Sequence, residues 1–225
     1  DKEVLFSNLK LNINLNEWTS IIGQSGSGKS TLLKIIAGMD LPKVFNNTLI
    51  NSNTNYSFSW MAQNDLLLPW ASVIENVTLG QKLRREKIDI KKAKNLLEQV
   101  GLINDTKKLP SMLSGGMKQR VALARTLMEN KDIILMDEPF SALDSITRSV
   151  IQKLTWKLLK NKTVIMVTHD PLEALLLSNN LYFISNKKLM PIKLPKSKPF
   201  RKVNNENLLY SHKYILNKLE KSYIS

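Results

Sequence analysis

The sequence predicts an α/β fold built around a mainly parallel β-sheet. Two observations support this prediction: short apolar runs alternate with stretches of helical periodicity, and a glycine-rich loop joins the first buried run to the first helix. The clearest unit is the apolar run Ile133–Met136, a helix over 146–158 capped by Asp144 or Ser145, and the apolar run Thr163–Val167. Because parallel neighbouring strands require a crossover connection, this order indicates a sheet covered by helices.

The first part of the chain supplies three predicted strands and one helix. Apolar residues alternate with polar residues over 9–16, which is typical of a half-buried strand. The apolar run Trp18–Ile22 predicts a buried strand, and the next helix spans Ser30–Ala37 and ends at Gly38. Aromatic residues alternate with serines over 56–60, which predicts another strand.

The middle of the chain, from about residue 69 to residue 130, is predicted to be helical. Apolar residues share one helical face over Lys91–Val100 and over Met117–Met128, and Gly101 ends the first of these helices. Residues from 191 onward are polar and basic, and we expect them to be irregular up to a short helix over 210–221.

Composition limits the classes of function. Apolar residues make up 43% of the 225 residues, enough for a core. No apolar run approaches the length of about 20 residues that crosses a bilayer, so we expect a transmembrane path to belong to another chain. The absence of cysteine excludes disulfides and thiolate metal sites.

The net charge of +14 is concentrated between residues 187 and 221, where ten Lys/Arg accompany two acidic residues. We interpret this basic tail as either a solvated surface or a contact for anionic lipid headgroups. On charge alone, binding to nucleic acid is a further interpretation.

Residues 23–30 match the phosphate-binding pattern G-x-x-x-x-G-K-[ST]. Glycines let backbone N–H groups curl around phosphate oxygens without a Cβ clash, and the following helix directs its positive end at the anion. Lys29 supplies a positive charge for the β- and γ-phosphates, and the Ser30 hydroxyl is suited to Mg²⁺. The predicted strand before the loop and the predicted helix after it disfavour a chance match.

Two carboxylates, Asp137 and Glu138, directly follow the buried run 133–136. Ligands bind at the carboxyl ends of strands in open α/β sheets, so this position suits nucleotide chemistry. We expect Asp137 to hold Mg²⁺ and Glu138 to polarise an attacking water. His169 follows the run 163–167 at the same predicted sheet edge, and we expect it to donate a hydrogen bond to the γ-phosphate.

A second glycine–serine turn, Leu113–Met117, opens a predicted helix and repeats the geometry of a phosphate site. Five of the eight glycines fall in this turn and in the phosphate loop. One subunit has no evident need for two such sites around one nucleotide, so we expect the second to contact a nucleotide held by another subunit. The alternative is a simple helix cap at Ser114.

Taken together, these motifs resemble those of ABC-transporter ATP-binding subunits over about residues 1–190. They follow the order of that family: the phosphate loop, Gln63, Leu-Ser-Gly-Gly at 113–116, Asp137-Glu138, Ser-Ala-Leu-Asp at 141–144, and His169. The resemblance implies a P-loop NTPase core with a mainly parallel sheet, an N-terminal antiparallel β portion and a helical subdomain inserted at about 64–115. Residues 191–225 would form a basic C-terminal extension.

The resemblance also implies a role for each matching residue, with ATP and Mg²⁺ as ligands. Glu138 resembles the general base, His169 the switch histidine and Lys29 the catalytic lysine of the Walker A loop. Mg²⁺ would be held by Ser30, Gln63 and Asp137. The nucleotide would be contacted by Gly23, Gln24, Ser25, Gly26, Ser27, Gly28, Lys29, Ser30, Thr31, Gln63, Ser114, Gly115, Gly116 and Asp144.

As partners, the family resemblance implies a second copy of the chain in a head-to-tail dimer and integral-membrane permease subunits. A periplasmic or lipid-anchored substrate-binding protein would act indirectly, and no nucleic acid is expected. The implied activity is ATP hydrolysis coupled to transmembrane transport. The implied location is the cytoplasmic face of the bacterial inner membrane, as a peripheral subunit.

Two departures from the usual family pattern carry information. Met117, where Gln is commoner, and the stretch Leu66–Trp70 resemble the subgroup that imports nitrate, sulfonates, taurine and thiamine pyrimidine precursors. The order Met61-Ala62-Gln63 favours the hydroxymethylpyrimidine branch. The family's adenine-stacking aromatic residue would precede Asp1, so we expect it outside this sequence.

Three alternatives stay open at this point. They are an ABC motor for export or lipoprotein release, a non-transport ABC ATPase acting on nucleic acid, and a small-molecule kinase with the same phosphate loop. The sequence contains neither a second cassette nor a long coiled-coil insertion, which opposes the nucleic-acid ATPase. The second glycine turn opposes the kinase, because a kinase would not need it.

Overall fold

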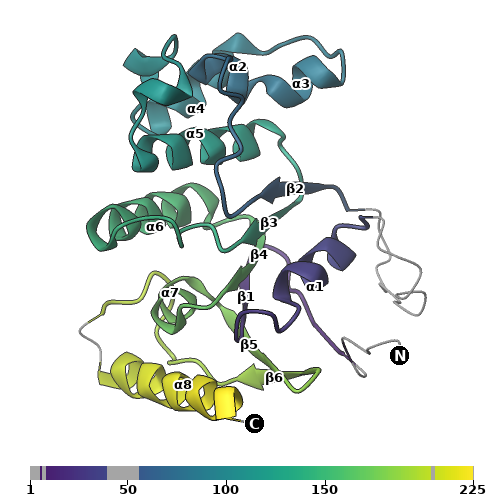
Figure 1. The fold of residues 1–225 in the computed structure, drawn as a ribbon, viewed down its shortest axis with the longest axis vertical. Coiled ribbons are helices and arrows are strands. Elements are labelled where there is room, and N and C mark those ends of the chain that lie inside the picture. The colour runs from purple at the N-terminus through teal and green to yellow at the C-terminus, as the bar shows by residue number, and fades with distance from the viewer. Residues whose placement is uncertain (1–5, 7–8, 40–55, 204–205, 225) are drawn as a thin grey trace. The chain divides into compact units, whose positions relative to one another are not determined.

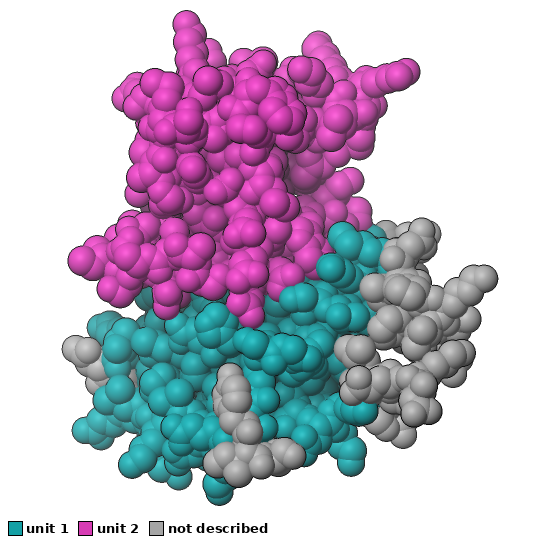
Figure 2. Space-filling view, in the orientation of Figure 1, with its two compact units in different colours: residues 1–56, 159–225 teal, residues 57–158 magenta. Residues whose placement is uncertain are grey.

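The computed structural model describes residues 6, 9–39, 56–203 and 206–224. The chain divides into two compact units (Figure 2): unit 1 comprises residues 1–56 and 159–225, and unit 2 comprises residues 57–158. Unit 2 is therefore inserted into unit 1 along the sequence. No helix in the described part of the chain combines the length and the apolar character that a membrane span requires.

The described residues of unit 1 form four strands in the order β4-β1-β5-β6. Strand β1 (Trp18–Ile22) pairs in parallel with β4 (Thr163–Thr168) and with β5 (Asn180–Ser185). Strand β6 (Lys188–Ile192) pairs with β5 in the antiparallel sense. Every residue of β1 and β4 is buried, as expected for parallel strands that are covered on both faces.

The described helices of unit 1 cover this sheet and one another (Figure 1). Helix α1 (Lys29–Ile36) contacts β4, and α7 (Pro171–Leu177) contacts β1 and β4. Helix α8 (Glu206–Ile224) packs against α7 and buries one leucine-rich face. The buried residues of that face are Leu208, Ile215 and Leu219.

Unit 2 is organised around the long helix α5 (Gly115–Met128). This helix contacts strand β2 (Phe58–Met61) and the helices α2 (Val73–Val77) and α4 (Ile90–Gln99). Strand β2 pairs in parallel with β3 (Ile133–Asp137). The remaining elements are α3 (Leu79–Leu83), α6 (Ser145–Leu159) and two 3₁₀ turns at Ile103–Asp105 and Pro110–Met112.

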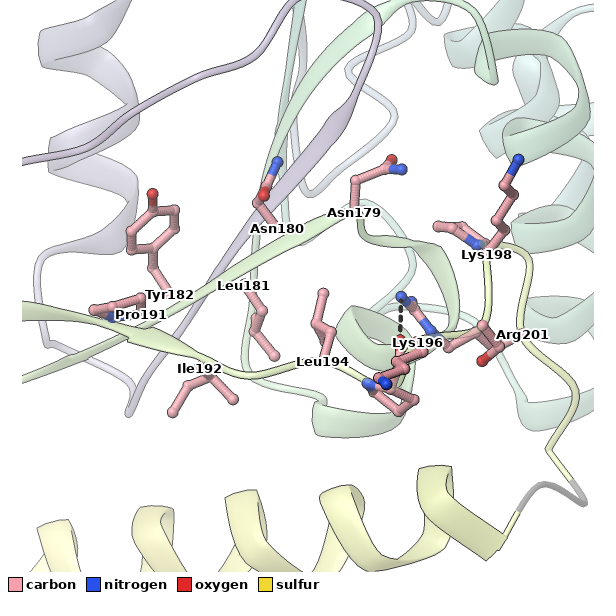
Figure 3. A pocket seen from close by; sticks show the side chains of 13 residues that line it. Asn179, Asn180, Leu181, Tyr182, Pro191, Ile192, Leu194, Lys196, Lys198 and Arg201 are labelled. Atoms are coloured by element: carbon pink, nitrogen blue, oxygen red, sulfur yellow. Dashed lines mark hydrogen bonds between the residues drawn. The ribbon is translucent and has the colours of Figure 1, made fainter.

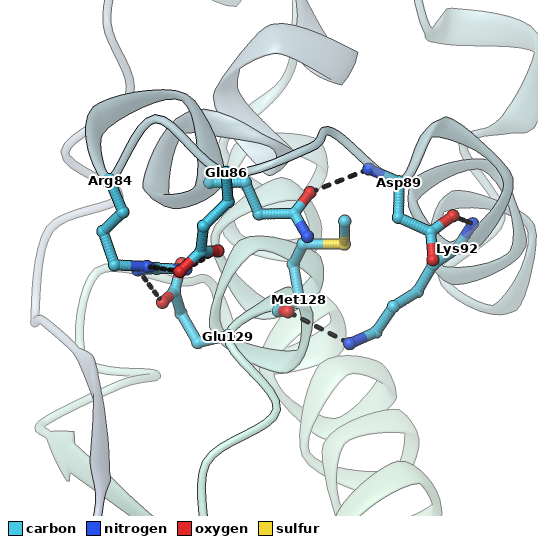
Figure 4. Close-up of polar contacts among 7 residues, drawn as sticks. Arg84, Glu86, Asp89, Lys92, Met128 and Glu129 are labelled. Atoms are coloured by element: carbon cyan, nitrogen blue, oxygen red, sulfur yellow. Dashed lines mark hydrogen bonds and ion pairs between the residues drawn. The ribbon is translucent and has the colours of Figure 1, made fainter.

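Polar contacts fix the connection between α3 and α4 onto the end of α5 (Figure 4). The Arg84 guanidinium pairs with Glu86 at 2.7 Å and with Glu129 at 2.5 Å. Asp89 caps α4 by accepting from the Lys92 amide at 2.8 Å, and the Lys92 ammonium donates to the Met128 carbonyl at 3.1 Å. These bonds position α5 within unit 2.

The predicted α/β fold with a mainly parallel sheet is confirmed. The strands predicted over 18–22, 56–60, 133–136 and 163–167 correspond to β1 to β4. The helices predicted over 30–37, 91–100, 117–128 and 146–158 correspond to α1, α4, α5 and α6. Each of these elements combines a clear apolar period with a recognisable start or stop signal.

The described elements differ from the local predictions in three places. Residues 9–14 keep the predicted alternation of half-buried and exposed side chains, but no strand is assigned to them among the described residues. Strands β5 and β6 were not predicted, although β6 extends to Ile192. Helix α8 begins at Glu206 rather than at 210, because Leu208 in its first turn is buried.

Candidate functional site

The phosphate loop of unit 1 is closed over a buried lysine. It follows β1 and ends at α1, and Gly26 and Gly28 have φ angles of 80° and 89°, which favour glycine. The side chain of Lys29 is 4% exposed, and its ammonium donates to the carbonyls of Gly23 at 2.9 Å and Gln24 at 2.6 Å. The loop backbone therefore surrounds a positive charge, as a phosphate site requires.

Gly23 is required for a different reason, namely space. A Cβ atom at this position would lie 2.4 Å from Cγ2 of Ile184 and 2.7 Å from its carbonyl oxygen. The loop thus starts against β5, and only a glycine permits that approach.

The first turn of α1 provides donors for an anion. Gly28 occupies the N-cap position and has no side chain to cap the helix, and no acidic residue lies in the first turn. Ser30 and Thr31 lie in that turn and are half-buried. The N–H groups of this turn and the helix dipole favour a negatively charged group at this end.

Two further residues connect the phosphate loop and β4 with the rest of unit 1. The Gln24 amide donates to Ser222 Oγ at 2.9 Å and to the Leu219 carbonyl at 3.4 Å, both on α8. His169 directly follows β4 and is exposed. Asp170 caps α7, so the turn that carries His169 is fixed on both sides.

In unit 2, the predicted site residues Gln63 and Glu138 lie side by side. Because β2 and β3 are parallel, both strands end at the same edge. The Gln63 amide donates to Glu138 Oε2 at 3.4 Å and to Ser141 Oγ at 3.3 Å. Asp137 ends β3, and both carboxylates are half-buried. Glu138 has a φ of 45°, an uncommon backbone angle for this residue type.

The second glycine turn caps α5. Ser114 Oγ accepts from the Met117 amide at 3.3 Å, so this serine is a helix cap. Gly115 is exposed and has open space where a Cβ would be. A Cβ on Gly116 would lie 2.6 Å from Cγ2 of Thr147, so close packing within unit 2 explains this second glycine.

Asp144 caps α6, whereas the sequence had left Asp144 and Ser145 as alternative caps. Its carboxylate accepts from the amides of Ile146 at 3.1 Å and Thr147 at 3.0 Å. These hydrogen bonds lower the pKa of Asp144, and those from Thr147 have a larger effect than the one from Ile146. Asp144 is exposed and carries a negative charge at the positive end of a helix.

Sequence reasoning missed three polar residues that hold the site loops of unit 2. The buried Gln119 side chain donates to the Pro139 carbonyl, next to Glu138. Arg125 donates to the carbonyls of Asp65 at 2.6 Å and Leu66 at 2.8 Å. Buried Asn76 bonds the loop 68–72 through both ends of its amide.

The local signals for these three residues were weak. Gln119 and Arg125 stand on the apolar helix α5, where a polar side chain at a core-facing position is the only indication. Their partners lie 20 to 60 residues away in the sequence, so no local pattern identifies them.

The fold and the phosphate loop define a nucleotide-binding ATPase. The chain belongs to the ABC transporter family, whose pattern it matches over residues 6–141. It is an ATP-binding subunit of an ABC transporter, and its activity is ATP hydrolysis.

Known proteins resemble the chain over most of its length. It is 41% identical to an uncharacterised ABC transporter ATP-binding protein of Haemophilus influenzae, over 96% of this chain and 93% of the relative. It is 43% identical to an aliphatic sulfonates import ATP-binding protein of Rhodococcus jostii, over 85% of this chain and 78% of the relative. A solved structure of a putative metal-chelate type ABC transporter in an inward-facing conformation matches the chain with a TM-score of 0.71 and 23% sequence identity. The match covers 93% of this chain and 82% of that chain, so the two share a fold.

Proposed function

We propose that this chain drives import of a small solute through a separate membrane permease by binding and hydrolysing ATP. The phosphate loop closed over buried Lys29 is the observation that carries the proposal. The relatives named as sulfonate import proteins support import over export or lipoprotein release.

In this proposal the phosphate loop binds the triphosphate. The N–H groups of residues 23–31 and the first turn of α1 surround the phosphate oxygens, and Lys29 transfers its hydrogen bonds from the loop carbonyls to them. The exchange keeps the ammonium paired in both states, so loading the site leaves no buried charge alone.

The donor set also fits Mg²⁺ held together with ATP. We assign Ser30, Gln63 and Asp137 as its ligands, which offer a hydroxyl, an amide and a carboxylate oxygen. Mg²⁺ prefers oxygen ligands and is commonly bound through one or two carboxylates plus substrate phosphates. When bound, the ion would neutralise charge on the β- and γ-phosphates.

Glu138 is assigned as the general base that accepts a proton from the attacking water. The Gln63 amide donates to its carboxylate, and the Ser141 hydroxyl, which donates to the Glu138 backbone carbonyl, accepts from the same amide and so holds Gln63 in place. His169 is assigned as a donor to the γ-phosphate, where negative charge increases during transfer.

The second glycine turn is assigned to a second copy of the chain. Ser114, Gly115 and Gly116 would contact the ATP held by the partner's phosphate loop, and Asp144 would lie at the dimer interface. Ser114 and Gly115 are exposed, which such a contact requires. Each ATP would then join two copies, and its hydrolysis would release them.

The segment 63–71 is assigned as the contact for the permease. Leu66 is 63% exposed and Trp70 is 75% exposed, which leaves two large apolar side chains at the surface. Arg125 and Asn76 fix the backbone beneath them. The assembly would lie at the cytoplasmic face of the membrane, and a substrate-binding protein would deliver the solute from the other side.

The solute is assigned to the group of nitrate, sulfonates, taurine and thiamine pyrimidine precursors. The similarity to aliphatic sulfonates import ATP-binding proteins favours an aliphatic sulfonate within that group. Purification of the assembled complex with its binding protein, followed by mass spectrometry of the bound solute, tests this assignment.

The variant Glu138→Gln tests the assigned reaction. We expect it to bind ATP, to form a stable ATP-bound dimer, and to lose turnover by about 10²–10⁴-fold, because a general base contributes rate enhancement of this size. Phosphate release and size-exclusion chromatography with ATP measure both effects. The matched control is Glu98→Gln, an exposed carboxylate on α4 that should leave both unchanged. Unimpaired turnover in Glu138→Gln would reject the assignment.

A further inference from the structure

A pocket of unit 1 lies outside every motif discussed above. It has a volume of about 420 Å³ and is formed by the start of β5, the end of β6 and the segment 194–201 (Figure 3). We call it the Arg201 pocket. Its size falls within the range of small-molecule sites.

Arg201 is a buried cation that pairs with no carboxylate among the described residues. Its side chain is 4% exposed, and one terminal nitrogen donates to the carbonyls of Leu175 and Ser178, each at 2.7 Å. The other terminal nitrogen reaches only the Pro195 carbonyl, at 3.4 Å, and Nε has no partner among the described residues. Burial lowers the pKa of the guanidinium. Buried charges are normally paired, so within the described part of the chain this guanidinium lacks its usual counter-ion.

The rim of the pocket adds positive charge. Lys196 and Lys198 are exposed and line it, and none of the described residues that line it is acidic. The nearby carboxylate of Glu17 lies outside the lining and accepts from the Asn180 amide at 2.7 Å. Three cationic residues therefore line one small volume.

The opposite wall is apolar. Leu181, Ile192 and Leu194 line it together with the ring of Tyr182 (Figure 3). Such a wall suits an organic body, whereas the cations suit an oxyanion with two negative charges.

We propose that the Arg201 pocket binds a small phosphomonoester, with its phosphate on Arg201, Lys196 and Lys198 and its organic part on the apolar wall. The phosphate group comes either from a soluble ester or from the headgroup of an anionic lipid. The proposal does not depend on the assigned ATP site, which uses other residues.

Calorimetric titration with phenyl phosphate tests the proposal, using the full chain with its phosphate loop saturated by ADP and Mg²⁺. We expect saturable binding that weakens at least about tenfold in the double variant Lys196→Ala/Lys198→Ala, because charge-assisted hydrogen bonds to the phosphate are lost. The control Lys160→Ala/Lys188→Ala removes two exposed lysines of unit 1 outside the pocket and should bind as the parent does. Arg201→Lys should also weaken binding, because lysine lacks the planar fork.

Co-sedimentation with phosphatidylcholine vesicles containing phosphatidic acid distinguishes the source of the phosphate. If vesicles bind through Lys196 and Lys198 while phenyl phosphate does not, the lipid headgroup is the ligand. If neither probe binds, the pocket is not a phosphate site. The same conclusion follows if the control double variant weakens binding as much as Lys196→Ala/Lys198→Ala does. The lysine variants decide the question even if Arg201→Lys fails to fold, because their side chains are exposed.

Discussion

Gly115 and Gly116 look equivalent in the sequence, but the structure gives them different tasks. Both belong to the turn that opens α5, yet only Gly116 has a neighbour within the reach of a Cβ atom. That neighbour is the Thr147 methyl group in the first turn of α6. Packing alone therefore requires a glycine at position 116, whereas exposed Gly115 has no such packing constraint.

This difference predicts that Gly116→Ala lowers the free energy of unfolding by about 1–3 kcal/mol, the usual cost of overpacking. Gly115→Ala should leave stability unchanged, because open space surrounds it. Urea denaturation measures both. Thr147→Ser removes the clashing methyl group, so the double variant with Gly116→Ala should regain most of the loss. Failure of that rescue would show that backbone conformation, rather than packing, selects the glycine.

At the scale of elements, the sequence predicts what a local pattern encodes. Helices α4 and α5 follow from their apolar period, and the phosphate loop follows from its glycines and lysine. The β5–β6 hairpin was missed because its turn, Asn186-Lys187, has positive φ angles at both residues without the glycine that usually indicates it. Contacts across the sequence, such as Arg125 to Asp65, leave no local pattern at all.

The loop between β2 and α2 depends on one buried polar residue of α2. Asn76 is fully buried and makes four hydrogen bonds to the backbone of residues 68–72. Asn76→Ala should cost about 2–3 kcal/mol of stability, because several buried backbone groups lose their partners. Hydrogen exchange should also speed up over 66–71. The control Asn104→Ala changes an exposed asparagine and should affect neither stability nor hydrogen exchange. Equal effects of the two variants would contradict the proposed role of Asn76 in holding the loop.

At the scale of the whole molecule, the excess of positive charge predicts that the native state becomes less stable at low pH. The chain carries +14 at neutral pH, and protonation of carboxylates adds to self-repulsion. Four carboxylates of unit 2 also have lowered pKa values. In each case a hydrogen bond to the carboxylate is the main cause of the lower pKa. The donors are Ser72 for Glu75, Arg84 for Glu86, Ser57 for Asp132 and Thr147 for Asp144.

A carboxylate whose pKa is lowered by folding stabilises the native state above its unfolded pKa, which is about 4 for Asp and Glu. That contribution is lost as the pH falls through the lower, folded pKa. The urea midpoint should therefore decrease from pH 6 towards pH 3, and added salt should reduce the part that arises from self-repulsion. Asp144→Asn provides the control, because asparagine caps a helix but does not titrate. We expect this variant to be less stable than the parent at pH 7 and to match it once Asp144 is protonated. A stability difference that stays constant over this pH range would show that the Asp144 charge does not contribute.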